Sequence, residues 1–489
     1  MGLAGFTVRT VGAAAVRGIG LEDLSIVERE SGLRRSLTRG QAIMISLGGA
    51  LGTSIFLSSG IALGYAGPAV LVSFAIAGFM AVVMVLSLSE MAVMHPAAGS
   101  FGAYAEMYLN SWAGFVVRYT YWFAQVIATG FEAVAAGIYM TFWFPQAPVW
   151  LWSLGFAFIV LFVNSRSVKN FGAVEYVFSF VKVTAIVLFI IIGAAHIFGL
   201  GVKPVGLGNL YQLPGGFFPH GAHGVWMAVI LGMLSFVGIE VIAVTSGELP
   251  NPEKTIPAAL RGMAVRLLLF YVLALGVIAA IIPWTQTGGS VTVTESPFVK
   301  VLGMSGIPHA AGIMNFVIIS AALSGMNTNV YLCSRMLFSL SRGDYAPGFL
   351  GKLSKAGAPV AAVLLSGGCI LVATALAKFT PKAYAYLQGV ALFGAIVVWI
   401  IILLSHLRFR AAHKAADLPV RMPFFPYMQI AGLGLLMALL ITMGLDKDWN
   451  VSWLVGVPWL ALLTVLYFAW RKTHAARRVA SAAIAKGAA

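Results

Sequence analysis

The fold of this chain is decided where a long apolar run is interrupted by small residues, in the stretch Gly48-Gly49-Ala50-Leu51-Gly52-Thr53-Ser54. A later apolar run holds a comparable interruption, Ser235-Phe236-Val237-Gly238-Ile239-Glu240. Glycine is conformationally free, so neither stretch favours a continuous helix. Membrane helices also use glycine for close packing, which would explain one such cluster. Two interruptions five apolar runs apart instead indicate an inverted-repeat membrane transporter with a ligand site near the middle of the bilayer.

Each interruption frees backbone N–H and C=O groups at a depth where lipid cannot bind them, so a cavity or a ligand must do so. The positive N-terminal ends of the half-helices favour a carboxylate, and the free carbonyls favour an ammonium group. A zwitterionic amino acid would satisfy both. We therefore predict a substrate site formed by residues 50–54 and 234–237. Phe236 is the candidate for an aromatic gate, because it lies in the second interruption.

The composition places the whole chain in lipid. Its 489 residues are 60% hydrophobic and only 10% charged, far from the balance of a soluble domain. We predict an all-α, polytopic membrane protein of about twelve membrane-spanning helices. The predicted helices cover residues 41–63, 68–94, 112–144, 150–164, 174–199, 225–246, 263–284, 310–340, 359–378, 384–407, 424–445 and 452–470. No soluble domain fits between them, so we do not expect an enzyme.

The formal net charge of +15 does not indicate nucleic-acid binding, because the basic residues lie in particular loops and form no single patch. On one side of the predicted membrane they are Arg34, Arg35, Arg39, Arg166, Lys169, Arg342, Lys352, Lys355, Arg408, Arg410, Lys414 and Arg421. The loops on the other side carry only Lys203, Lys300, Lys378, Lys382 and Lys447. The positive-inside rule therefore puts both termini in the cytoplasm.

Cys333 and Cys369 both fall within predicted helices, where neither a disulfide nor a metal site is expected. We predict no metal and no cofactor. The segment before Arg34 has no long apolar core and no cleavage site, so it is predicted to be a cytoplasmic tail and not a signal peptide.

Several short motifs recur in a characteristic order. They are Gly48 to Phe56, Ser89-Glu90-Met91, Pro96 to Phe101, Phe236 to Glu240 with Gly247-Glu248 and Asn251-Pro252, and Asn327 to Phe338. In this order the sequence resembles the amino acid transporter family of bacterial amino acid permeases, within the amino acid-polyamine-organocation superfamily. The resemblance covers nearly the whole chain from Arg34.

This resemblance implies a leucine-transporter-like fold in the cytoplasmic membrane of a bacterium. Two inverted five-helix repeats would occupy residues 40–200 and 201–408, and two additional helices would occupy residues 409–471. Residues 1–39 and 472–489 would be cytoplasmic tails.

The resemblance also implies how the substrate is held. Its carboxylate would meet Gly52, Thr53 and Ser54, and its amine would meet carbonyls near Ala50, Leu234 and Val237. The family usually reads Gly-Thr-Gly where this chain has Gly52-Thr53-Ser54. The added hydroxyl of Ser54 would either narrow the site or alter one hydrogen bond.

Lys182 lies inside the fifth predicted helix, with apolar residues on both sides. A lysine near the membrane centre costs about 2.5–3.5 kcal/mol, so it marks a functional site unless it snorkels to the interface about two turns away. The resemblance favours function, because proton-coupled relatives place a lysine here where sodium-coupled ones keep a cation site. We predict that Lys182 carries the coupling proton and ties the fifth and eighth helices to the first interruption.

Two acidic residues are further candidates for the proton path. Glu132 lies near the middle of the third predicted helix, and Glu240 directly follows the second interruption. Burial disfavours the charged form of a carboxyl group, so either could exchange a proton with the cavity. The alternative for each is a purely structural hydrogen bond.

Other charged residues lie near the predicted helix ends. Glu90, Glu248 and Arg335 are candidates for the cytoplasmic gate, or for fixing loops. Arg118 and Arg266 are predicted to anchor their helices at the membrane interface.

Together these features predict a secondary active transporter that takes up amino acids with protons by alternating access. No second strong charge pair marks the side-chain pocket, which favours a small or neutral substrate. A sodium symporter or an exchanger on the same fold, and an amino acid sensor without transport, remain alternatives. A channel is disfavoured because the helices offer no continuous polar pore. The expected partners are an amino acid, protons and membrane lipid, and not nucleic acid.

Overall fold

The computed structural model describes residues 26, 44, 51–95, 99–165, 168–200, 203–244, 269–287, 296–354, 357–413, 418 and 420–487. Over these ranges the chain is helical and contains no β-strand. Eight helical segments of the described chain are long and apolar enough to cross a membrane. They are Ser54–Met94, Ser111–Met140, Ala173–Phe198, Ala310–Arg342, Val360–Lys378, Ala383–Ala412, Tyr427–Leu445 and Val451–Arg471.

The first of these segments contains two helices. These are α3 (Ser54–Ala66) and α4 (Val70–Met94), which a 3-10 turn separates. Three shorter apolar helices also overlap predicted spans, namely α7 (Val149–Asn164), α9 (Gly221–Phe236) and Leu269–Ile281. The all-helical membrane fold is thus observed. The count of twelve spans and the five-plus-five repeat remain predictions.

Both interruptions fall at the ends of short helices. α3 has 13 residues and begins directly after the non-helical Leu51–Thr53, while α9 has 16 residues and ends at Phe236. At 1.5 Å per residue these helices are about 20 and 24 Å long, shorter than a hydrocarbon core. Gly238 has φ of 103°, a conformation that favours glycine, and a new helix, α10 (Val241–Val244), begins three residues later. The second interruption therefore lies between α9 and α10.

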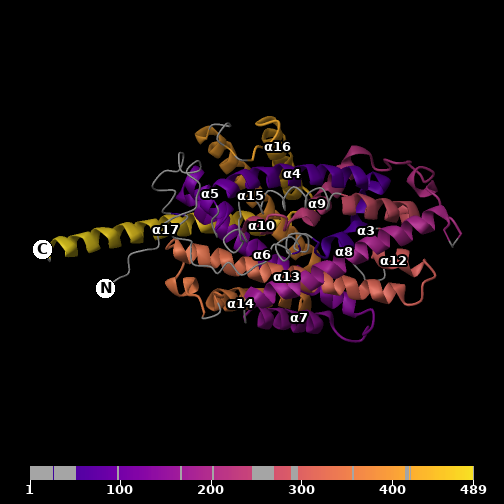
Figure 1. The fold of residues 1–489 in the computed structure, drawn as a ribbon, viewed down its shortest axis with the longest axis horizontal. Helices are drawn as coiled ribbons and strands as arrows, with labels where there is room; N and C mark the ends of the chain where they lie inside the picture. The colour runs from indigo at the N-terminus through magenta and orange to yellow at the C-terminus, as the bar shows by residue number, and fades with distance from the viewer. Residues whose placement is uncertain are drawn as a thin grey trace.

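Three long helices form the centre of the molecule. α6 (Ser111–Met140) packs along α13 (Ala310–Arg342) and along α15 (Ala383–Ala412). Their most apolar segments are 72–78% buried, against 28% for α8 (Val168–Phe198) and 22% for α17 (Val451–Gly487). In Figure 1, α6 and α13 lie in the middle, with α16 (Tyr427–Leu445) above and α7 below.

The other helices surround this centre. α3 and α4 both pack against α9, so the first interruption lies close to the second. A short helix, α5 (Phe101–Tyr108), connects α4 to α6 and packs on α6, while α12 (Pro297–Gly303) and α14 (Val360–Ala375) pack on α13.

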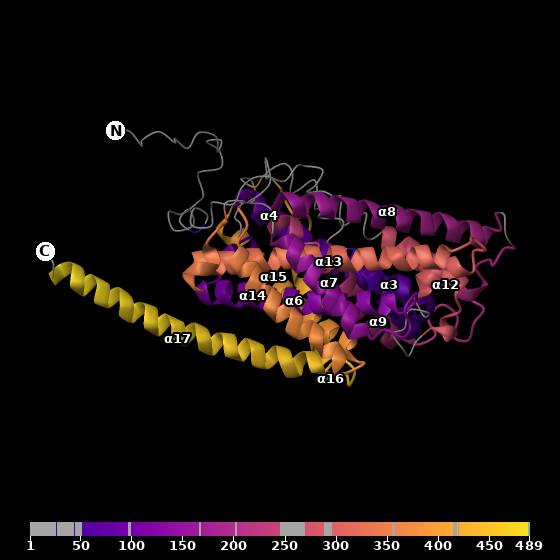
Figure 2. The ribbon, with the colours of Figure 1, turned by 90° about the horizontal axis from the view of Figure 1, so that it is seen from below.

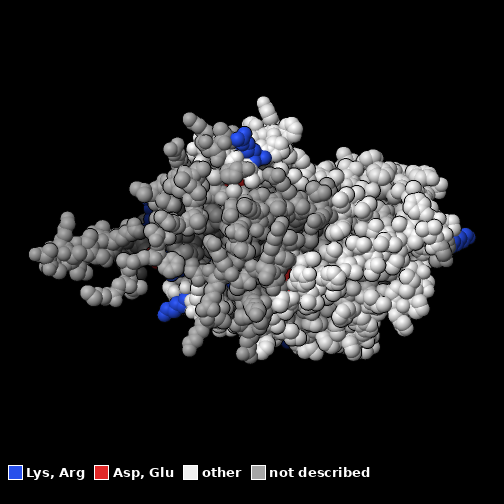
Figure 3. Space-filling model, in the orientation of Figure 1, with Lys and Arg blue, Asp and Glu red and all other residues white. Residues whose placement is uncertain are grey.

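The outward faces of the peripheral helices are apolar. Phe158 of α7, Phe180 of α8, Val372 of α14 and Leu454 of α17 are each more than half exposed. Figure 3 shows almost no charge over the described part of the visible face, apart from a few lysine and arginine side chains at its edges and small patches of acidic side chains. Large apolar side chains are stable in this position only when lipid surrounds them.

The last helix is longer than its predicted span. α17 runs from Val451 to Gly487, whereas the span predicted from hydropathy ends at residue 470. Figure 2 shows α17 leaving the body of the molecule and extending beyond it.

Candidate substrate and coupling site

A cavity of about 40 Å³ lies between the two helix interruptions. Its lining comes from both interruptions and from α6, α13 and α15. The lining residues are Gly52, Ser54, Ala124, Gln125, Ala128, Phe131, Glu132, Leu234, Val237, Gly238, Gly325, Asn329, Ala391 and Ala395. The fold therefore gathers at one cavity four residues predicted to bind substrate, Gly52, Ser54, Leu234 and Val237, although some 180 positions separate the two pairs.

The other predicted substrate residues lie elsewhere. Thr53 is fully buried beside the cavity and takes part through its backbone. Phe236 is 1% exposed and packs against Tyr271, with 5.0 Å between ring centroids, and it does not line the cavity. Ala50 lies outside the described residues.

Glu132 joins the first interruption to α6. Its carboxylate accepts hydrogen bonds from the Thr53 backbone N–H, at 3.1 Å to Oε1 and 3.3 Å to Oε2. A Cβ atom added to Gly52 would lie 2.5 Å from Glu132 Oε1. Only glycine at position 52 lets the carboxylate approach this closely.

Glu240 has a similar position at the second interruption. Its Oε1 accepts a hydrogen bond from the Tyr121 hydroxyl at 3.0 Å, and its Oε2 accepts one from the Gly238 backbone N–H at 3.2 Å. Tyr121 and Glu132 are eleven residues apart on α6, about three helical turns, so they share one face. One face of α6 thus contacts both interruptions.

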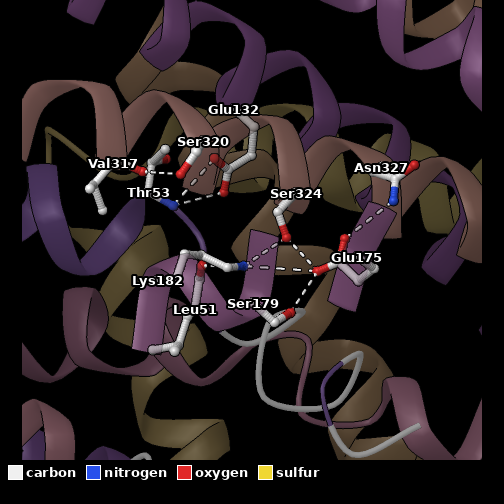
Figure 4. A network of polar contacts seen from close by, with 10 residues as sticks. All are labelled: Leu51, Thr53, Glu132, Glu175, Ser179, Lys182, Val317, Ser320, Ser324 and Asn327. Atoms are coloured by element: carbon white, nitrogen blue, oxygen red, sulfur yellow. Dashed lines mark hydrogen bonds and ion pairs between the residues drawn. The ribbon is translucent and has the colours of Figure 1, made fainter. Parts of the chain in front are cut away.

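Lys182 of α8 is fully buried and does not itself line the cavity. Its Nζ donates to the Leu51 carbonyl at 3.0 Å and to Ser324 Oγ at 2.7 Å. Figure 4 shows the ammonium group between the first interruption and α13. The fold therefore excludes the snorkelling alternative, because the side chain points inward and has no exposed surface.

Glu175, which was not among the predicted site residues, belongs to the same network. Its Oε1 accepts a hydrogen bond from the Ser324 hydroxyl and lies 3.9 Å from Lys182 Nζ. Its Oε2 accepts from Asn327 Nδ2 at 3.2 Å, and Ser179 donates to Oε1 at 3.3 Å. Glu175 precedes Lys182 by seven residues, two turns of one helix face, and this spacing was a usable signal.

Two of the predicted gating residues, Glu90 and Arg335, do not line the cavity. Glu90 of α4 is buried, accepts a hydrogen bond from the Met422 backbone N–H, and lies 2.8 Å from His406 Nε2. The guanidinium of Arg335 lies 3.8 Å from the ring centroid of Tyr331. Glu248 and Arg266 lie outside the described residues.

Arg118 is not an interface anchor, contrary to the prediction. It is fully buried. Its Nη1 forms an ion pair with Glu106 Oε2 at 2.9 Å, and its Nε donates a hydrogen bond to Ser339 Oγ at 2.9 Å. The Tyr345 hydroxyl donates to the other oxygen of Glu106 at 2.9 Å. Burial and the Glu106 carboxylate raise the pKa of Tyr345 to about 12, so this hydroxyl remains a donor. The cluster joins α5, α6 and α13.

Residues 41–480 match the amino acid permease family. Three similar proteins come from Bacillus subtilis (strain 168). The uncharacterized amino acid permease YtnA is 40% identical over 443 residues, 89% of this chain and 95% of the relative. The amino-acid permease RocC is 38% identical over 442 residues, 87% of this chain and 92% of the relative. The gamma-aminobutyric acid permease is 34% identical over 461 residues, 93% of this chain and 97% of the relative.

The family match covers most of the chain, and the relatives are aligned over nearly their whole length. The apolar helices agree with this assignment, because a permease must cross the membrane several times. The chain belongs to the amino acid permease family, and is a multi-pass membrane transporter of amino acids and not an enzyme.

Proposed function

We propose that this permease takes up small or neutral amino acids across the bacterial cytoplasmic membrane, driven by protons, through alternating access. The observation that carries the proposal is the position of the Lys182 ammonium group. It contacts the Leu51 carbonyl and Ser324 Oγ at 3.0 and 2.7 Å. A single positive charge thereby ties the first interruption, α8 and α13 together.

Protonation of Lys182 can act as the switch between access states. The charged ammonium has three donors and binds the carbonyl and the hydroxyl strongly. The neutral amine binds them more weakly, so the first interruption becomes free to separate from α8 and α13. Alternating access needs such an element with two stable arrangements. A bound sodium ion would serve the same purpose in a sodium symporter, so a covalently attached cation supports proton coupling.

The cavity lining supports a small or neutral substrate. Ala124, Ala128, Gly325, Ala391 and Ala395 contribute little volume, and the cavity measures about 40 Å³ in this conformation. Of the three relatives described above, one is named for gamma-aminobutyric acid, and the names of the other two specify no substrate. The lining therefore carries this part of the proposal.

Transport by the purified protein in proteoliposomes tests the proposal. Each of the twenty amino acids is supplied as radiolabel, with and without an inward proton gradient, in the presence and absence of sodium. We expect proton-driven accumulation without sodium, fastest for a small or neutral amino acid.

Each alternative gives a different result. A requirement for sodium would identify a sodium symporter, and a requirement for internal amino acid would identify an exchanger. Binding without flux would identify a sensor. Any of these results would overturn the proposal of proton-driven uptake.

A further inference from the structure

We propose that Glu175 is the proton acceptor of Lys182, and that the Ser324 hydroxyl carries the proton between them. The inference rests on the proposed proton-coupled function and adds to it the route by which the proton leaves the lysine. It assigns a role to a buried carboxylate and a buried hydroxyl that hydropathy did not single out.

The geometry favours transfer through the hydroxyl over direct transfer. Lys182 Nζ and Glu175 Oε1 are 3.9 Å apart, too far for a hydrogen bond. Ser324 Oγ lies between them, accepting from Lys182 Nζ at 2.7 Å and donating its own hydrogen to Glu175 Oε1. Figure 4 shows the three groups in this order. A hydroxyl that accepts on one side and donates on the other can pass a proton without moving.

The transfer balances in atoms and charge. A Lys182 N–H bond breaks as an O–H bond forms on Ser324 Oγ, while the former Ser324 hydroxyl proton bonds to Glu175 Oε1. The products are a neutral amine, an intact hydroxyl and a carboxylic acid. The pair is neutral in sum before and after transfer. All three residues are fully buried, and the low-dielectric site therefore never holds an unpaired charge.

The hydrogen-bond network continues beyond Glu175. Asn327 Nδ2 donates to Glu175 Oε2 at 3.2 Å, and Asn164 Nδ2 donates to Asn327 Oδ1 at 2.8 Å. Asn164 is the last residue of α7. Glu175 itself lies two turns closer than Lys182 to the start of α8, the end that the sequence predicts to face the cytoplasm. The acceptor is thus displaced toward the side on which an imported proton must leave.

The other groups around Lys182 and Glu175 are compatible with proton transfer from the lysine to the carboxylate. Among the described residues, the charged groups that act on Lys182 are Glu175 and, more weakly, Glu132 of α6. Of the described residues of the first interruption, Leu51 accepts a hydrogen bond from the ammonium group through its carbonyl. α13 and α7 contribute the uncharged Ser324, Asn327 and Asn164 to the network. Glu132 bonds instead to Thr53, which leaves Glu175 as the acceptor within relay distance.

A fixed counter-ion is the competing explanation for Glu175. A carboxylate that only neutralises Lys182 would be needed for folding and for every mode of transport. A proton acceptor is needed only when net proton movement drives the cycle. During exchange of internal for external amino acid, the transporter changes its access state with substrate bound in both directions. Exchange therefore does not require release of the proton. The two roles therefore predict different results for exchange and for accumulation.

The experiment uses the full-length protein in proteoliposomes and the amino acid that shows the fastest uptake of the twenty. Four variants are compared with the wild type, namely Glu175→Gln, Ser324→Ala, Ser324→Thr and the control Ser320→Ala. Ser320 lies one turn from Ser324 on α13, and its hydroxyl donates to the Val317 carbonyl. Counterflow measures exchange, and uptake under an inward gradient of one pH unit measures proton-driven accumulation.

One coupled proton per substrate and a gradient of one pH unit allow about tenfold accumulation, since one unit corresponds to 1.36 kcal/mol. We expect the wild type and Ser320→Ala to approach this ratio. Glu175→Gln and Ser324→Ala should fall to about the external concentration and should lose accumulation by a larger factor than they lose counterflow, because neither residue lines the cavity. Ser324→Thr keeps the hydroxyl and should restore accumulation.

Each contrary result has a distinct meaning. If Glu175→Gln accumulates substrate as fully as the wild type, the proton relay is wrong and the proposed function is unaffected. Parallel loss of counterflow and accumulation in Ser324→Ala, without rescue by Ser324→Thr, would make the network structural. A wild type that does not accumulate substrate under the gradient would remove both proposals. If Glu175→Gln does not fold, the alanine and threonine variants at position 324 decide the question.

Discussion

The Glu132 carboxylate accepts a hydrogen bond from the backbone N–H of Thr53 at 3.1 Å. Thr53 is the N-cap of α3, where free N–H groups and the helix dipole favour a negative charge. The fold therefore places an acidic side chain at the position predicted for the substrate carboxylate. Two carboxylates cannot both hold this position while both are ionised.

Glu132→Gln should make substrate binding less dependent on pH. In the wild type, ionised Glu132 competes with the substrate carboxylate, so binding should weaken as pH rises. The amide keeps a hydrogen-bond acceptor for Thr53 but carries no charge, and affinity at pH 8 should increase about tenfold. Binding measured by competition between pH 5.5 and 8 checks this. Glu132→Asp, which keeps the charge, is the matched control. Parallel pH profiles of binding for Glu132→Gln and the wild type would show that Glu132 does not compete with the substrate carboxylate.

Gly52→Val should abolish substrate binding in a protein that still folds. The first atom of the new side chain would lie 2.5 Å from Glu132 Oε1, the end of a flexible side chain that can move away. The hydrogen bond to Thr53 and the close approach of a carboxylate to this backbone would both be lost. Gly155→Ala on α7 is the control, since no atom lies within 4 Å of its added Cβ. Size-exclusion profiles report folding, and retained affinity in folded Gly52→Val would refute the site.

Glu240→Gln should shift the pH dependence of transport. Glu240 accepts hydrogen bonds from the Tyr121 hydroxyl and the Gly238 N–H, and an amide can accept both only through one oxygen. One contact is therefore lost, at a cost of about 1–3 kcal/mol. Initial uptake rates from pH 5 to pH 8 measure the shift. Tyr121→Phe removes one contact without removing the acid, so it should lower the rate and leave the pH profile in place. Superimposable profiles for Glu240→Gln and wild type would make Glu240 structural.

Lys182→Met should leave exchange partly intact and remove proton-driven accumulation. It should also lower stability by about 3 kcal/mol, because Glu175 is left as a buried charge without its ammonium partner. Adding Glu175→Gln to Lys182→Met removes that charge and should recover much of the loss. Thermal unfolding of the purified single and double variants in detergent tests the pairing. A double variant less stable than Lys182→Met would show that the two residues do not compensate each other.

His95 should make the protein less stable in mild acid. Burial and, to a smaller degree, His413 lower the pKa of His95 from 6.5 to about 4. The unfolded chain therefore takes up a proton as pH falls below 6.5, while the folded chain does not until about pH 4. Stability is fully present above pH 6.5 and declines through this window, by about 3 kcal/mol at most.

Thermal unfolding of His95→Gln and wild type at pH 7.5 and 5 measures this contribution. The glutamine variant should lose less stability between the two pH values. His223→Gln serves as the control, because the His223 side chain is exposed. An equal loss in His95→Gln and wild type would show that another group controls acid stability.

Much of the fold was predictable from the sequence because hydropathy and glycine act locally. An apolar run must become a helix in lipid whatever its neighbours are, and a glycine-rich stretch weakens that helix where it stands. Both interruptions followed from this, as did the position of Lys182 within a helix. Phe236 shows the limit, since the same local argument placed it at the cavity, whereas its ring packs on Tyr271 instead.

Only the tertiary structure decided which polar groups meet. Ser324 lies 142 positions from Lys182 and Ser339 lies 221 positions from Arg118, yet each pair forms a hydrogen bond. The sequence could show that Lys182 and Arg118 are costly in a membrane, but not whether a partner or the interface would satisfy them. For Lys182 the partner network includes Glu175, and for Arg118 it includes Glu106. The physical reason is that the energy of a buried charge depends on the groups around it, and packing between distant helices brings those groups together.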